Sequence, residues 1–128
     1  MIRLLVFIIL LGVGANQVSA QQQMQVDRPP ETSVILGDLA WVLGASHYLS
    51  VLCEGKNTQT WRDAMVELLE LESPHYRLRR NLVSEFNSGY QNQQRRFYSC
   101  DTVSKQQLQT ISKQGRILSD SLADPYLK

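Results

Sequence analysis

The first twenty residues have the pattern of a secretory signal, and no other feature constrains more what the rest of the chain can fold into. A single basic residue, Arg3, precedes an apolar run from Leu4 to Val13, and Val18-Ser19-Ala20 follows. This order is typical of a signal that is cleaved after Ala20. The apolar run is shorter than the roughly 20 residues that span a bilayer, so we expect no membrane span in the mature chain. Residues 1–20 are therefore predicted to be removed on export, which leaves one small soluble domain.

The mature chain contains two cysteines, Cys53 and Cys100. An exported protein reaches an oxidising compartment, where two cysteines most simply form a disulfide. They lack the close Cys-x-x-Cys spacing of a redox or zinc site, and His47 and His75 add no cluster of ligands. We therefore predict a structural disulfide and expect neither a metal ion nor another cofactor. Closing a loop of this length stabilises a fold by about 4 kcal/mol.

The charges of the mature chain balance. The full sequence has 13 basic and 12 acidic residues, and removal of the signal takes away only Arg3, which leaves 12 of each. Proteins that bind nucleic acid normally present a strongly basic face, so this balance argues against a nucleic-acid partner. The charges are nevertheless unevenly placed, with acidic residues concentrated at 54–72 and arginines at 77–96. We expect two helices whose solvated faces of opposite sign pair with each other.

Four helical segments are predicted, after a flexible arm at 21–32 that contains glutamines and prolines but no apolar period. The segment 34–53 is apolar on nearly every side, which is typical of a central helix buried by its neighbours. Amphipathic segments follow at 60–72, from about 74 to 97, and from 101 or 102 to about 122. Gly44 and Ala45 would let another helix approach closely, and Gly89 indicates a close packing contact in the third segment.

Several residues are predicted to mark the ends of these helices. Ser33 is the expected N-cap of the first helix, and Gly55 is a natural stop at its other end. Thr60 and Asp63 have the side-chain types of a capping box for the second helix. Ser73-Pro74 is expected to end the second helix and to start the third, with the serine as its cap.

Four helices with short connections predict an all-α fold, a small irregular four-helix bundle stapled by one disulfide. The bundle is expected to occupy residues 33–128 as a single domain. The disulfide between Cys53 and Cys100 would tie the end of the first helix to the turn between the third and fourth.

No known catalytic motif occurs in the chain. His47 with a carboxylate could act as a general base, although a lone histidine in a buried helix more often has a structural role. Glu67 and Glu70 lack the Glu-x-x-His partner that a carboxylate-bridged metal site needs. Neither a nucleophile elbow nor a glycine-rich phosphate loop is present. The sequence therefore favours a binding protein over an enzyme.

An amide and an arginine beside aromatic rings are suited to hold a ligand or a partner peptide, because buried polar groups need partners and aromatic rings supply contact area. These side chains could equally hold each other at the polar ends of a small core. The candidate binding residues are His47, Tyr48, Trp61, Arg62, Asn87 and Tyr90.

Four short motifs occur in a defined order along the mature chain. They are His47-Tyr48-Leu49 with Leu52-Cys53, Trp61-Arg62-x-x-Met65, Phe86-Asn87-x-Gly89-Tyr90, and Tyr98-x-Cys100. This combination resembles a family of short, exported alphaproteobacterial proteins that carry a domain of unknown function, and the resemblance covers about Leu36 to Leu122. It implies a periplasmic location in a Gram-negative cell and a paired Cys53 and Cys100. It implies no activity, cofactor or catalytic residue.

These observations lead us to expect a periplasmic helical module that binds another cell-envelope component, most simply a protein. Two alternatives stay open. One is a small cell-wall-acting hydrolase that uses His47 or a glutamate near Arg62, and the other is a carrier of a small apolar ligand between the helices.

Overall fold

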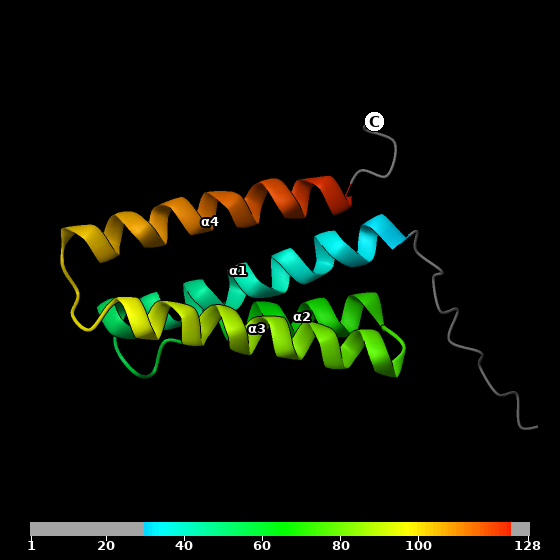
Figure 1. The fold of residues 1–128 in the computed structure, drawn as a ribbon, viewed down its shortest axis with the longest axis horizontal. Helices are drawn as coiled ribbons and strands as arrows, with labels where there is room; N and C mark the ends of the chain where they lie inside the picture. The colour runs from blue at the N-terminus through cyan, green and yellow to red at the C-terminus, as the bar shows by residue number, and fades with distance from the viewer. Residues whose placement is uncertain (1–29, 124–128) are drawn as a thin grey trace, which may run out of the picture.

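The computed structural model describes residues 30–123, which form four helices joined by short turns (Figure 1). The helices are α1 (Pro30–Glu54), α2 (Thr60–Glu72), α3 (Tyr76–Arg96) and α4 (Thr102–Ala123). Consecutive helices run in opposite directions (Figure 1). The described residues contain no strand, so the predicted all-α class and the four-helix bundle are confirmed. The expected signal at 1–20 and residues 21–29 of the expected arm lie outside the described residues.

The first helix, α1, is the centre of the fold. It packs against α2, α3 and α4, whereas these three helices make few contacts with one another. In Figure 1, α4 lies on one side of α1, and α2 and α3 lie on the other. Eleven residues of α1 are buried, and they are spread around the helix rather than confined to one stripe. The prediction of a central helix that is covered by its neighbours is therefore confirmed.

By length and composition alone, α1 could also cross a membrane. In the fold, 61% of its most apolar 18-residue window is buried by the rest of the protein. A core helix of a soluble protein passes the same test of length and hydropathy, because it too must be apolar on most sides. The apolar character of α1 is thus accounted for by its place in the core.

The core has two parts, which lie on different sides of α1. Each part joins residues of α1 to the apolar stripes that the sequence period predicted for the other helices. The first contains Leu36, Leu39, Ala40 and Leu43 of α1 with Met65, Leu69 and Leu82 of α2 and α3. The second contains Val42, Ala45, Tyr48 and Leu49 of α1 with Ile111 of α4.

The backbones of α1 and α3 touch where glycines face each other. A Cβ atom placed on Gly44 would lie 1.8 Å from the carbonyl oxygen of Phe86, and one on Gly89 would lie 2.0 Å from that of Trp41. No side chain fits between the helices at this point. The expected close approach at Gly44 and Gly89 is confirmed, and α3 is the most extensive partner of α1.

The first helix begins at Pro30, three residues before the start expected at Ser33. Residues 30–32 of the expected arm are therefore helical. A proline in the first turn loses no helical hydrogen bond, because the first N–H groups of a helix have no partner within it. Glu31 in the same turn interacts favourably with the positive end of the helix dipole. At the other end, the N–H of Gly55, which has φ +110°, donates to the carbonyl of Val51, as expected for a glycine stop.

Two predicted caps are wrong. The N-cap of α2 is Gln59, without a side-chain hydrogen bond, and Thr60 is already the first helical residue. A capping box with Asp63 requires Thr60 to be the N-cap, outside the helix, so it does not form. Ser73 adopts a left-handed conformation, φ 40°, that ends α2, and it does not cap α3. The cap of α3 is His75, whose Nδ1 accepts a hydrogen bond from the N–H of Leu78 at 3.3 Å.

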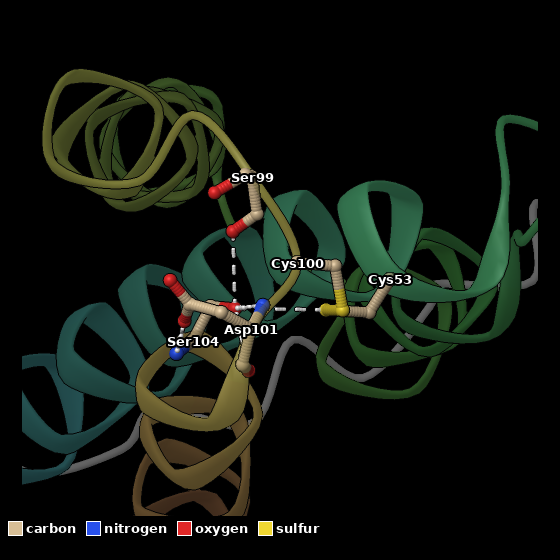
Figure 2. The surroundings of a disulfide bond; sticks show 5 residues. All are labelled: Cys53, Ser99, Cys100, Asp101 and Ser104. Atoms are coloured by element: carbon tan, nitrogen blue, oxygen red, sulfur yellow. Dashed lines mark hydrogen bonds between the residues drawn. A yellow bond between two sulfur atoms is a disulfide. The ribbon is translucent and has the colours of Figure 1, made fainter.

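The disulfide and the start of α4 form one unit (Figure 2). Cys53 at the end of α1 is bonded to Cys100 in the turn between α3 and α4, with the Cα atoms 5.0 Å apart. Asp101 Oδ1 accepts from the N–H of Ser104 at 2.9 Å, and Ser104 Oγ accepts from the N–H of Asp101 at 2.8 Å. This reciprocal pair caps α4 at Asp101, one of the two expected positions. The predicted staple is confirmed.

The expected pairing between the charged faces of α2 and α3 is not found in the part of the chain that the structure describes, Glu72 apart. Leaving Glu72 aside, the acidic residues of α2 and the arginines of α3 form no ion pair among residues 30–123. Both helices turn their apolar stripes towards α1, so Glu70 on α2 and Arg79 on α3 are exposed to solvent. The opposite charges therefore lie on outer surfaces instead of between the two helices.

Candidate functional site

Three of the six candidate binding residues form an aromatic cluster between α1 and α3. The His47 ring lies 5.9 Å from the ring of Phe86 and 5.7 Å from that of Tyr90, and both contacts are tilted. Tyr48 meets the Tyr90 ring edge-on at 5.2 Å and donates its hydroxyl hydrogen bond to the carbonyl of Phe97. Such aromatic pairs stabilise a contact beyond the area that they bury. Tyr48 is buried, whereas His47 and Tyr90 are half-buried.

The environment of His47 keeps its imidazole neutral near neutral pH. Burial, and secondly the positive charge of Arg62, lower the pKa of His47 below its ordinary value of 6.5. The Arg62 side chain of α2 thus belongs to the surroundings of this ring, although Arg62 itself is exposed. His47 Nδ1 is buried and has no hydrogen-bond partner among residues 30–123, so no described carboxylate holds this nitrogen as in an acid–base dyad.

Burial also raises the pKa of Tyr48, and the neighbouring phenols of Tyr90 and Tyr98 act in the same direction. The phenol is therefore protonated and serves as a hydrogen-bond donor to the backbone. This role is structural, because it fixes the chain after α3 against α1. His47 and Tyr90 are the two half-buried members of the cluster, and both carry polar atoms.

Trp61 is placed elsewhere, at the start of α2. Its indole Nε1 donates to the hydroxyl of Ser50 in α1 at 2.7 Å, and Ser50 is almost fully buried. The hydrogen bond satisfies both polar groups and fixes the start of α2 against α1. The ring also contributes to the wall of a groove on the side of α2 that faces α4.

Asn87 is not brought together with the other candidates. It is exposed on the outer side of α3, where it lines a shallow hollow of about 500 Å³. Its neighbours there include Tyr76, Arg79, Arg80 and Val83. The guanidinium of Arg80 lies over the Tyr76 ring, 5.6 Å from its centre. The two ends of this sequence motif therefore differ in their surroundings, since Tyr90 contacts the rings of His47 and Tyr48 whereas Asn87 is exposed.

The groove beside Trp61 is lined mainly by apolar side chains, and we call it the α2/α4 groove. Its volume is about 480 Å³, and it is open to solvent. The floor is formed by Leu39 and Leu43 of α1. The α2 wall consists of Trp61, Ala64, Glu67, Leu68 and Leu71, and the α4 wall of Ser112, Gly115, Arg116 and Ser119. Because α2 and α4 each pack on α1 and hardly on each other, the space between them is left open.

Only Trp61 of this groove was a candidate from the sequence. A signal was present in α4, where Ser112, Gly115 and Ser119 recur at spacings of three and four residues. Small side chains at this spacing form one face of a helix. Because this face of α4 lies opposite the apolar side chains of α2, its small residues leave a space that larger side chains would fill.

The described residues contain no group of three or more histidine, cysteine, aspartate or glutamate side chains that could hold a metal ion. Glu67 lies at the α2/α4 groove, and Glu70 is exposed on a different face of α2. These two glutamates therefore do not converge with His47 on a common point. What the arrangement offers chemically is an apolar groove with a few polar groups on its rim, which suits binding.

Comparison with known proteins places the chain in a family. No curated protein and no solved structure matches it. One family model does match, over residues 33–126, which include α2, α3, α4 and nearly all of α1. The matched part contains the disulfide, the aromatic cluster and the α2/α4 groove. The chain therefore belongs to the family described as protein of unknown function (DUF2385).

Proposed function

We propose that this protein is an exported, non-catalytic helical module that binds an apolar helical segment of another cell-envelope protein in the α2/α4 groove. The observation that carries this proposal is the groove itself, with its apolar floor and its apolar α2 wall. Leu71, on that wall, is 76% exposed. A helix that lays an apolar ridge into such a groove would cover these side chains, as in known helix-in-groove complexes.

The shape of the groove fits this kind of partner. Its two walls are helices packed on the same central helix, so a further helix between them would continue the packing that already holds the bundle together. The two charged residues of the groove lie on opposite walls, with Glu67 on α2 and Arg116 on α4, and both are exposed. Charges on the rim of an interface contribute to orientation and to the rate of association more than to affinity.

The cellular location is part of the proposal. The pattern of residues 1–20 supports export, and the Cys53–Cys100 disulfide supports an oxidising compartment such as the periplasm. The test is to fractionate cells and to measure the mass of the chain with and without reduction. We expect an oxidised chain that starts at Gln21 in the periplasmic fraction. A reduced, full-length chain in the cytoplasm would contradict this part of the proposal.

The binding site is tested by site-specific photocrosslinking in living cells. A crosslinker at Leu71 should capture one defined envelope protein, whereas a crosslinker at Ile117 should not. Ile117 is 59% exposed on α4 but does not line the groove, which makes it a matched control. The Leu71→Glu variant should abolish capture through a second crosslinker at Ser119, and Ile117→Glu should leave it intact. Equal capture from both positions, or none from Leu71, would refute the groove as the binding site.

A second candidate function is the carriage of a small apolar ligand. The volume of the groove, about 480 Å³, lies within the range of about 300–1,000 Å³ that is usual for ligand sites. Native mass spectrometry of the protein, purified gently from the cell envelope, distinguishes the two. Extra mass that is lost on denaturation would favour the carrier, and a bare chain would favour the protein partner.

A further inference from the structure

The outer sides of α2 and α3, away from α1, carry opposite charges together with exposed apolar side chains. On α2 the exposed ridge is Asp63, Val66 and Glu70, and on α3 it is Tyr76, Arg79, Arg80 and Val83. Within each ridge the residues are three, four or seven positions apart, except for the neighbouring Arg79 and Arg80, so each ridge follows one side of its helix. Together they are called the α2/α3 outer face. It is distinct from the α2/α4 groove and shares no residue with it.

These charges are unfavourable for the helices that carry them. The last turn of α2 contains Glu70 but no basic residue, and the beginning of α3 contains arginines but no acidic residue in its first turn. Carboxylates near a helix C-terminus and cations near an N-terminus are both opposed by the helix dipole. Among residues 30–123, no ion pair offsets this at Glu70, Arg79 or Arg80. Charges that oppose the helix dipole without a compensating contact are expected at sites that bind another molecule.

Large apolar side chains are exposed beside these charges. Tyr76 is 74% exposed, Val66 48% and Val83 41%. Tyr76 and Val83 line the shallow hollow of about 500 Å³ on α3, together with Arg79 and Arg80. Exposed apolar area next to a hollow rimmed by charges is typical of an interaction surface. The arginines of α3 would fit a binding partner that presents acidic and apolar side chains on a single helical ridge.

The α2 ridge of a second copy of this chain has these properties. Because α2 and α3 are consecutive and antiparallel (Figure 1), Glu70 and Arg79 lie close to the turn that joins them, while Val66 and Val83 lie farther along. A two-fold axis parallel to the helices places α2 of one copy over α3 of the other at the same height. Glu70 then faces the partner's Arg79 and Arg80, and Val66 faces the partner's Val83. An axis across the helices would instead bring like charges together.

We propose that the protein forms a two-fold symmetric dimer through the α2/α3 outer face, with the acidic ridge of each copy on the arginine ridge of the other. A two-fold interface must be self-complementary, and this face is, because it carries acidic residues on α2 and arginines on α3. The arrangement leaves the α2/α4 groove of each copy open. Dimerisation therefore goes beyond the proposed function and would give each assembly two grooves.

The test is sedimentation equilibrium of the purified, oxidised protein and of two charge-reversal variants, Glu70→Arg and Arg79→Glu/Arg80→Glu. We expect a wild-type dimer whose dissociation constant is about 100 µM or tighter and rises with salt. Each variant alone should weaken the dimer by at least about 100-fold, because both symmetry-related contacts then bring like charges together. All altered residues are exposed, so the variants should keep the wild-type melting temperature.

The decisive sample is an equimolar mixture of the two variants. In a mixed dimer both contacts again join a carboxylate to an arginine, so the mixture should dimerise although neither variant does so alone. A wild type that stays monomeric at 100 µM, as expected if the arginines instead serve an acidic segment of another protein, would overturn the proposal. So would variants that dimerise like the wild type, or a mixture that stays monomeric.

Discussion

Replacing Gly44 with alanine adds a methyl group at the one place where the backbones of α1 and α3 touch. The added carbon would lie 1.8 Å from the carbonyl oxygen of Phe86 and 2.7 Å from its carbonyl carbon. A carbon and an oxygen that are not bonded approach to about 3.3 Å, so the two helices must separate by about 1.5 Å. Because the obstacle is backbone, no change of rotamer can relieve the clash.

The expected loss of stability follows from two opposing effects. Overpacking costs about 1–3 kcal/mol, and the upper end applies here because α3 would have to move away from its most extensive partner. Alanine is the better helix former by about 1 kcal/mol, which offsets part of that cost. We expect Gly44→Ala to lower the free energy of unfolding by about 2 kcal/mol, or the melting temperature by about 8–16 °C.

The matched control is Gly37→Ala in the same helix. The nearest atom to a Cβ at Gly37 is Cγ of Glu85 at 3.8 Å, an ordinary van der Waals contact with a flexible side chain. This variant should therefore gain up to about 1 kcal/mol from helix propensity alone. Urea denaturation followed by circular dichroism measures both. If Gly44→Ala were as stable as Gly37→Ala, the contact between the backbones of α1 and α3 would be refuted.

Three further predictions concern the staple, the cap and the histidine. Reducing the Cys53–Cys100 disulfide should lower the free energy of unfolding by about 4 kcal/mol, and urea titrations with and without reductant measure this loss. Ser104→Ala should lower the free energy of unfolding by about 1–2 kcal/mol, because it leaves the N–H of Asp101 without its acceptor. The control is Ser121→Ala on the exposed part of α4, which should cost less than about 0.5 kcal/mol in the same assay. The pKa of His47 is lower in the folded than in the unfolded chain, so its contribution to stability is complete above pH 6.5 and is lost as the pH falls from 6.5 towards the folded pKa. His47→Phe should flatten this part of the curve of unfolding free energy against pH, and an unchanged slope would contradict the environment described for the ring.

The helices and their order could be predicted because periodicity and apolar character act along the chain. Residues 34–53 are apolar on nearly every side, a pattern that suits a helix in the centre of a core. The caps of α2 and α3 were predicted wrongly because a shift of one or two positions changes which residue lies just outside the helix. The N-cap of α2 is Gln59 and not Thr60, and that of α3 is His75 and not Ser73. In both places the side-chain types alone favour the wrong residue.

The candidate site was predicted less completely, because it depends on the rotation of helices and on the spaces between them. His47 and Tyr90 meet, but Asn87 is exposed and lines a separate hollow on α3. The α2/α4 groove exists because two helices that pack on α1 hardly contact each other, and no single segment encodes that gap. Gln93 gives a similar example: glutamine is mostly an exposed residue type, but Gln93 is fully buried and accepts a hydrogen bond from Gln107 of α4 at 3.3 Å.

The dependence of every helix on α1 sets the order in which parts of the molecule open. A helix of 13 residues such as α2 is too short to persist alone in water, and α1 is its main support. Detachment of α2 leaves the contacts of α1 with α3 and α4 in place, whereas disruption of α1 removes the support of all three. Backbone amides of α2 should therefore exchange with solvent through a local opening, while those buried at the contact of α1 with α3 exchange only when the whole chain unfolds. The disulfide joins the end of α1 to the turn before α4, so α4 stays tethered to the part of the molecule that opens last.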